Sequence, residues 1–148
     1  MERPRQKILV VDDAANWRMT LETVLKPRGY EVTAASNVLE AMEAIGQGPY
    51  SAAILDVRLD SLDDTDNEGL STVLSSAHTA DPWMSFIVIS SYYNETEVRR
   101  LVPEGVNLFY FDKNNFMADE LIRVLQKIAR RKKWLQRLLS LLKIIKIG

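Results

Sequence analysis

The sequence predicts an α/β protein: a doubly wound sheet of five parallel strands in the order 2-1-3-4-5, followed by an extended C-terminal helix. Three observations predict this fold. Five short runs of apolar or β-branched residues alternate with segments whose apolar residues recur at helical spacing. Right-handed crossovers between parallel strands favour this strand order, whose switch point lies between the first and third strands. The 148 residues, 47% of them hydrophobic, are enough for one substantial core.

Each expected element has its own signal in the chain. The expected strands are residues 7–11, 31–34, 52–55, 86–89 and 108–111. Buried faces of three helices are expected at Trp17, Leu21, Val24 and Leu25, at Ala41, Met42 and Ile45, and at Leu70, Val73, Leu74 and Ala77. Helix ends are expected at Pro27 with Gly29, at Gly46 with Gly48, and at Pro103 with Gly105.

Composition excludes several classes of protein. The chain has no cysteine, so it has no disulfide, thiolate metal site or thiol nucleophile. No segment reaches the roughly 18 consecutive apolar residues that span a bilayer. The N-terminal residues run directly into the first strand, without the apolar region of a secretory signal. We therefore expect a cytoplasmic protein.

Three carboxylates follow two strands that are expected to be neighbours. Asp12 and Asp13 follow the first strand, and Asp56 follows the third. Because the carboxyl ends of parallel strands meet at one edge of a sheet, these side chains are expected to converge there. Like charges at close range need a cation or a proton, and a hard divalent ion such as Mg²⁺ suits carboxylate oxygens. One of the three could then accept a phosphoryl group.

Three further residues lie at the ends of the fourth and fifth strands. Ser90 follows the fourth strand, while Tyr110 and Lys113 lie at the end of the fifth. Alone, each has an ordinary structural explanation, but the ordered set is specific. From residue 7 to about 130, the chain resembles the receiver domains of two-component response regulators.

That resemblance implies a role for each residue. Asp56 would be the phosphoacceptor, and Asp12, Asp13, Asp56 and the backbone carbonyl of Arg58 would bind Mg²⁺. Lys113 and Ser90 would contact the phosphoryl group, and Ser90 and Tyr110 would be the switch residues. The donor would be a histidine kinase or a phosphotransfer protein, so the chain would be a signalling switch rather than a classical enzyme. Output would pass through the face formed by the fourth helix, the fifth strand and the fifth helix.

Two departures from the family pattern bear on function. Gly69 lies thirteen positions after Asp56, which implies about five inserted residues within an acidic segment, 60–68. This segment resembles half of an EF-hand loop, but Ser75 stands where the bidentate carboxylate belongs, so a solvated acidic loop is favoured over a calcium site. Arg58 and Tyr92 are bulky at positions where the family tunes water access, which predicts slow autodephosphorylation.

The residues bear on three alternative functions. A haloacid-dehalogenase-like phosphatase needs an acid two residues after its nucleophilic aspartate, and Arg58 occupies that position. A dinucleotide-binding protein needs a Gly-rich turn after the first strand, where two carboxylates stand instead. A degenerate receiver that acts as a phosphorylation-independent interaction module stays open.

The last 33 residues differ in charge from the rest. Residues 1–115 carry ten Lys/Arg against eighteen Asp/Glu, whereas residues 116–148 carry nine against two. We expect a receiver domain over residues 1–130 and a basic amphipathic helical extension over residues 131–148. Leu135, Leu138, Leu142 and Ile145 follow three- and four-residue steps, which favours a parallel homodimer or a partner helix.

Other roles for this extension rank lower or stay open. Contact with an anionic membrane surface ranks next, and nucleic acid is disfavoured because no recognition helix is evident. The extension could also fold back on its own domain, where its positive charge would meet the acidic body.

Overall fold

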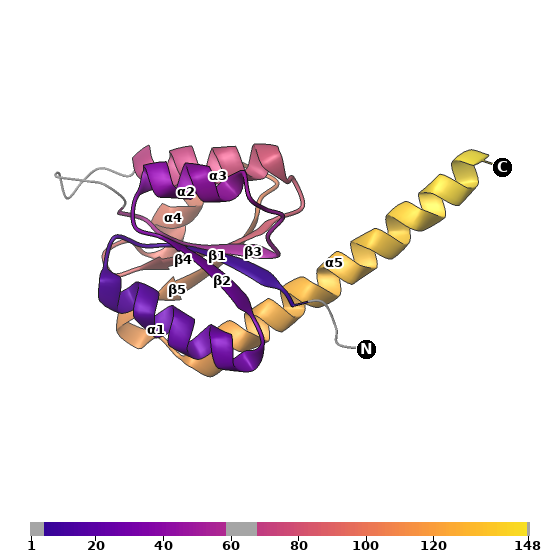
Figure 1. Ribbon diagram of the computed structural model, residues 1–148. Coiled ribbons are helices and arrows are strands. Elements are labelled where there is room, and N and C mark those ends of the chain that lie inside the picture. Colours follow the sequence, from indigo (N-terminus) through magenta and orange to yellow (C-terminus); the bar gives the residue numbers. More distant parts are fainter. Residues whose placement is uncertain (1–4, 59–67, 148) are drawn as a thin grey trace.

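The computed structural model describes residues 5–58 and 68–147 and confirms the expected fold (Figure 1). One sheet contains five parallel strands in the order β2-β1-β3-β4-β5. The strands are β1 (Lys7–Val11), β2 (Glu31–Ala35), β3 (Ala52–Asp56), β4 (Ser85–Ser90) and β5 (Asn107–Asp112). The three inner strands are almost wholly buried, because helices cover both faces of the sheet.

Helices form a layer on each side of the sheet (Figure 1). The α-helices are α1 (Ala15–Leu25), α2 (Val38–Ile45), α3 (Glu68–Ala80), α4 (Glu95–Leu101) and α5 (Ala118–Ile147). One core cluster joins α1 and α5 to the sheet, and the other joins α2, α3 and α4 to its opposite face. This arrangement leaves the carboxyl edge of the sheet free of helices, so residues at the strand ends can meet there.

Local sequence explains where several helices begin and end. The Asn94 side chain accepts a hydrogen bond from the Glu97 amide, and the Glu97 carboxylate accepts one from the Asn94 amide, which caps α4. Helix α1 passes into a 3₁₀ turn that contains Pro27 and ends at Gly29, whose φ is 88°. The expected end of the first helix is therefore confirmed.

One detail of the expected helix faces is wrong. Met42 was expected on the buried face of α2, but it is 38% exposed. Ala41 is buried as expected, and Ala44, which was not expected there, is also buried. Ala41 and Ala44 are three residues apart and so share one helix face, and their small side chains allow close packing against the core.

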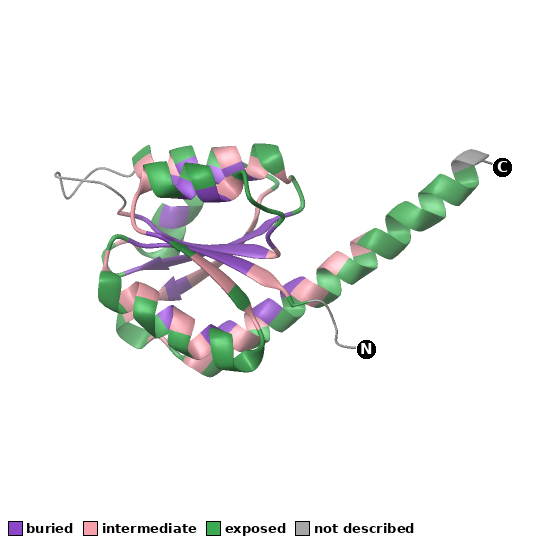
Figure 2. Cartoon of the chain, in the orientation of Figure 1, coloured by how far each residue is buried: buried purple, intermediate pink, exposed green. Residues whose placement is uncertain are grey.

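The C-terminal helix α5 is 30 residues long, which confirms the expected extended helix, and no Gly or Pro interrupts it. Leu121, Leu125 and Ile128 are buried against the sheet, and the helix then continues beyond the domain (Figure 2). The part of α5 beyond the domain does not fold back on the sheet or on the other helices (Figure 1). No helix in the described part of the chain is both long and apolar enough to cross a bilayer.

Candidate functional site

The structure brings together the three carboxylates that the sequence singled out. Asp12 and Asp13 directly follow β1, and Asp56 is the last residue of β3, the strand that pairs with β1. One oxygen atom from each carboxylate lies within 4.8 Å of the others. Asp12 and Asp56 are buried, whereas Asp13 is exposed, so the cluster opens to solvent on the Asp13 side.

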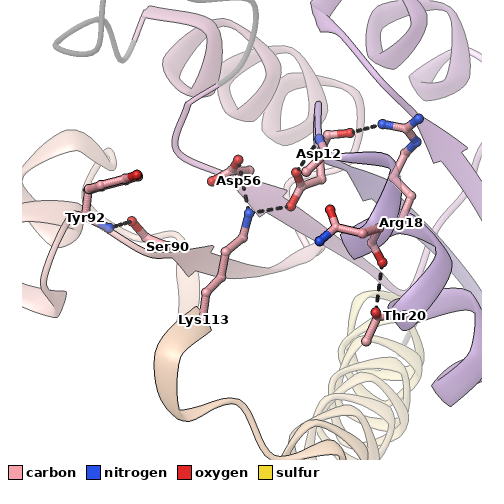
Figure 3. Close-up of polar contacts among 9 residues, drawn as sticks. Asp12, Arg18, Thr20, Asp56, Ser90, Tyr92 and Lys113 are labelled. Carbon is pink, nitrogen blue, oxygen red and sulfur yellow. Dashed lines mark hydrogen bonds and ion pairs between the residues drawn. The ribbon is translucent and has the colours of Figure 1, made fainter.

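Lys113 inserts its ammonium group between two of these carboxylates (Figure 3). It begins the 3₁₀ turn Lys113–Asn115 after β5, and its side chain is 7% exposed. Nζ lies 2.8 Å from Oδ2 of Asp12 and 3.3 Å from Oδ2 of Asp56. One ammonium cannot neutralise three carboxylates, so the site keeps an excess of negative charge.

Asp12 is held in place on three sides. Its Oδ1 accepts a hydrogen bond from the Ala14 amide at 2.9 Å, and its Oδ2 pairs with Lys113. Its backbone carbonyl accepts a hydrogen bond of 2.7 Å from the Arg18 guanidinium (Figure 3). The Asp12 carboxylate is therefore fixed beside Asp56 rather than free to turn away.

The local environment makes Asp56 harder to ionise than an ordinary aspartate. Burial is the largest cause, and the neighbouring Asp12 carboxylate adds to it; together they raise the pKa of Asp56 to about 6. The Lys113 ammonium partly offsets both effects. A cation bound to the cluster would favour the ionised form.

The raised pKa predicts that Asp56→Asn stabilises the metal-free protein at neutral pH. The unfolded carboxyl ionises near pH 4, so the folded state binds the proton more tightly between about pH 4 and pH 6. The free energy of unfolding should therefore fall across this range, and above it the ionised Asp56 carboxylate should destabilise the folded state by roughly 3 kcal/mol. Asn carries no charge, so the substituted protein does not bear this cost.

Thermal melts of Asp56→Asn and the wild type at pH 4 and pH 7.5 test the prediction. If Asp56→Asn stabilised the protein equally at pH 4 and at pH 7.5, the prediction would be contradicted. Asp119→Asn is the control, because Asp119 is an exposed aspartate.

The residues around this cluster define what it could bind. All three donors are carboxylates, which suit a hard cation such as Mg²⁺ and do not select soft metals. The excess negative charge and the exposed Asp13 leave one side available for an ion. The residues present therefore fit Mg²⁺.

Ser90 and Tyr110 are joined through a single loop residue. Ser90 is buried at the end of β4, and its Oγ accepts a hydrogen bond from the Tyr93 amide at 3.0 Å. The Tyr110 hydroxyl donates a hydrogen bond of 2.7 Å to the Tyr93 carbonyl. Movement of Ser90 would therefore disturb the contact of Tyr110 through the backbone of Tyr93.

The side chains of Arg58 and Tyr92 stack on each other at the site. The Arg58 guanidinium carbon lies 3.7 Å from the centroid of the Tyr92 ring, in the geometry of a cation–π contact. Both side chains line a cavity of about 340 Å³ that Asp13, Asp56, Ser90 and Lys113 also line. Both residues were identified from the sequence as bulky, but their stacking on each other was not predicted.

Trp17 is the site residue that sequence reasoning missed. It was expected to be a packing residue, and it does pack edge-on against Phe116, with ring centroids 5.5 Å apart. It also lines the cavity, and Nζ of Lys113 lies 5.1 Å from its ring centroid. Its place four residues after Asp13, in the first turn of α1, is the only signal that could have indicated this.

The acidic segment is described only at its end. Glu68 begins α3. Asp60, Asp63, Asp64 and Asp66 lie outside the described residues, so the solvated loop and the half EF-hand stay predictions.

The fold and the site define a class: a five-stranded doubly wound domain with an acidic cluster and a lysine at its carboxyl edge. The family model of the response regulator receiver domain matches residues 8–133. The chain therefore belongs to the receiver domain family of two-component signalling, as the motif set predicted.

Individual relatives cover different shares of the chain. The probable transcriptional regulator ycf27 of Pyropia yezoensis is 48% identical over 63 residues, which are 43% of this chain and 26% of that protein. The chain thus spans about a quarter of that relative's length. The chemotaxis protein CheY of Listeria monocytogenes is 27% identical over 125 residues, covering 84% of this chain and 98% of that one.

Solved structures show the same fold. NtrX from Brucella abortus, in complex with ADP, has a TM-score of 0.75 and 26% identity, covering 92% of this chain and 29% of that chain. A CheY-like receiver domain from Methanospirillum hungatei has a TM-score of 0.71 and 23% identity, covering 87% of this chain and 98% of that chain.

Proposed function

We propose that this chain is a signalling switch that accepts a phosphoryl group on Asp56 from a phosphohistidine of a histidine kinase or phosphotransfer protein. The observation that carries the proposal is the Lys113 ammonium, held between Asp56 and Asp12 within the carboxylate cluster. A lysine placed by chance after β5 would not be buried against two carboxylates. The same contact favours a working receiver over a degenerate interaction module. Residues 1–130 would form the cytoplasmic switch and residues 131–148 a separate extension.

The proposed reaction is an in-line displacement at phosphorus. A carboxylate oxygen of Asp56 forms the new P–O bond, the P–N bond to the donor histidine breaks, and the imidazole nitrogen keeps the electron pair and takes a proton. Mg²⁺, held by Asp13, Asp56, Asp12 through water and the Arg58 carbonyl, would supply positive charge to the phosphoryl oxygens. Lys113 adds a second positive charge from the β5 side.

The signal would leave the site through the Ser90–Tyr93–Tyr110 hydrogen bonds. The new phosphoryl oxygens can accept a hydrogen bond from the Ser90 hydroxyl and attract Lys113. A shift of Ser90 would move the Tyr93 backbone and release the Tyr110 hydroxyl. Tyr110 also lines a cleft of about 520 Å³ between α4, β5 and α5, which is the surface proposed for partner binding.

Phosphotransfer from a small donor tests the proposal. The chain is incubated with Mg²⁺ and acetyl phosphate, and its intact mass is measured beside that of Asp56→Asn. A phosphoryl adduct on the wild type alone is expected. No adduct on either protein would favour the phosphorylation-independent interaction module.

The Arg58–Tyr92 stack predicts a long-lived phosphoaspartate. The stacked side chains narrow the approach of water to Asp56, so Tyr92→Ala should speed hydrolysis severalfold. The decay of the adduct after donor removal measures this rate. Trp83→Ala is the control, since Trp83 is an exposed aromatic residue that does not line the site cavity. Equal lifetimes for Tyr92→Ala and the wild type would show that the stack does not shield the site.

A further inference from the structure

The far half of α5 carries an uncovered apolar face. We define this face as Trp134, Leu135, Leu138, Leu139, Leu141, Leu142 and Ile145. Trp134 is 60% exposed, Leu141 58% and Ile145 72%, because this part of the helix extends beyond the domain (Figure 2). Large apolar side chains in such a row indicate contact with something outside the described chain.

The geometry of the face shows which kind of surface it fits. At about 100° per residue, its members cover roughly 160° of the helix circumference, and no polar residue between 133 and 145 falls within that arc. The arc is centred roughly 90° around the helix from Leu121, Leu125 and Ile128, which pack on the sheet. It is also broader than the narrow seam that joins two coiled-coil helices. A broad apolar arc suits a flat surface better than one partner helix.

The charge of this segment narrows the choice further. No acidic residue follows Glu120. Six cations lie between residues 130 and 145, namely Arg130, Arg131, Lys132, Lys133, Arg137 and Lys143. Lys133 lies opposite the centre of the apolar arc, whereas Arg137 and Lys143 flank the arc at roughly 120° from its centre. Arg131 lies in line with the arc, one turn nearer the domain. Two copies side by side would repel each other and would lack the acidic partners that usually pair with lysine across a coiled coil.

We propose that the far half of α5 is an amphipathic helix that binds the surface of an anionic phospholipid membrane. The apolar face would enter the boundary between headgroups and acyl chains, and the cations would contact lipid phosphates. Nucleic acid could meet the cations but would leave the apolar face exposed to water. The breadth of the apolar arc and the lack of acidic residues therefore favour a membrane surface over the paired helix that the three- and four-residue spacing had favoured. This proposal does not rest on phosphorylation of Asp56.

Vesicle co-sedimentation of the full chain tests the proposal. Vesicles of phosphatidylcholine alone are compared with vesicles that also contain about one third phosphatidylserine, at low and at high salt. Binding is expected with the anionic vesicles and should weaken with salt, since part of the attraction is electrostatic. Asp56→Asn should bind equally well, which separates this result from the switch proposal. Absence of binding to anionic vesicles would overturn the proposal.

Two matched variants test the role of the apolar face. Leu142→Glu places a carboxylate near the centre of the arc, whereas Ile144→Glu makes the same change in charge at a more exposed residue on the cationic side. Vesicle binding should be lost in Leu142→Glu and largely kept in Ile144→Glu. Equal loss in both variants would show that charge alone holds the chain on the vesicle, and would overturn the proposed insertion of the apolar face. Dimers in light scattering that Leu142→Glu dissociates, without vesicle binding, would identify a second copy as the occupant instead. Binding to duplex DNA but not to vesicles would also overturn the proposal.

Discussion

Asp13→Ala is expected to abolish phosphorylation of the chain without unfolding it. Asp13 is the exposed member of the carboxylate cluster and the proposed direct ligand of Mg²⁺, so its loss should slow adduct formation by about two orders of magnitude or more. The fold should tolerate the change, since an exposed side chain contributes little to stability and its removal relieves repulsion from Asp12 and Asp56. The free energy of unfolding should stay within about 0.5 kcal/mol or rise.

The rate of adduct formation from acetyl phosphate and a thermal melt of the same preparation check this together. Asp119→Ala is the matched control, because Asp119 is an exposed aspartate whose contact is an ion pair with Arg28. Undiminished phosphorylation of Asp13→Ala would remove Asp13 from the proposed metal site. Loss of folding would show that the cluster stabilises the domain, contrary to the account.

Lys113→Met is expected to have the largest effect on stability. It leaves two buried carboxylates, Asp12 and Asp56, without the cation that lies within 3.3 Å of both. Removing one partner of a buried ion pair commonly costs about 3 kcal/mol. Millimolar Mg²⁺ should restore part of the loss, because a cation in the cluster supplies the missing positive charge.

Urea unfolding with and without Mg²⁺ measures both effects. Lys26→Met is the control, since Lys26 pairs with Glu22 on the surface with its side chain 57% exposed, and should change stability by less than about 1 kcal/mol. Unchanged stability in Lys113→Met would contradict the buried ion pair. A loss that Mg²⁺ does not reduce would count against a cation site at Asp13 and Asp56.

The sequence predicted the sheet and the strand-end residues for a simple physical reason. Inner parallel strands are covered on both faces, so each appears as a continuous apolar run, and the run's end fixes where Asp12, Asp56 and Ser90 lie. The strands are slightly longer than expected: Asp56, Ser90 and Asp112 are their last residues, because Asp56 still pairs with Ile89 and Ser90 with Asp112. A polar residue marks the end of an apolar run but does not interrupt backbone pairing.

The contacts that refine the site could not be predicted in this way. The stacking of Arg58 on Tyr92, and the two hydrogen bonds through Tyr93, depend on the conformation of loops from different strands. The contact between Trp17 and Lys113 brings together residues almost a hundred positions apart. The spacing of residues in a sequence predicts helices and strands. It does not predict contacts between residues that belong to different elements or loops.

Locating the phosphoryl group in the chain tests whether Asp56 is the phosphoacceptor. After treatment with Mg²⁺ and acetyl phosphate, reduction of the acyl phosphate with borohydride converts the modified aspartate to homoserine, which peptide mass spectrometry can place. We expect homoserine at position 56 and at no other aspartate. Homoserine at Asp12 or Asp13, or at none of the three, would contradict this expectation.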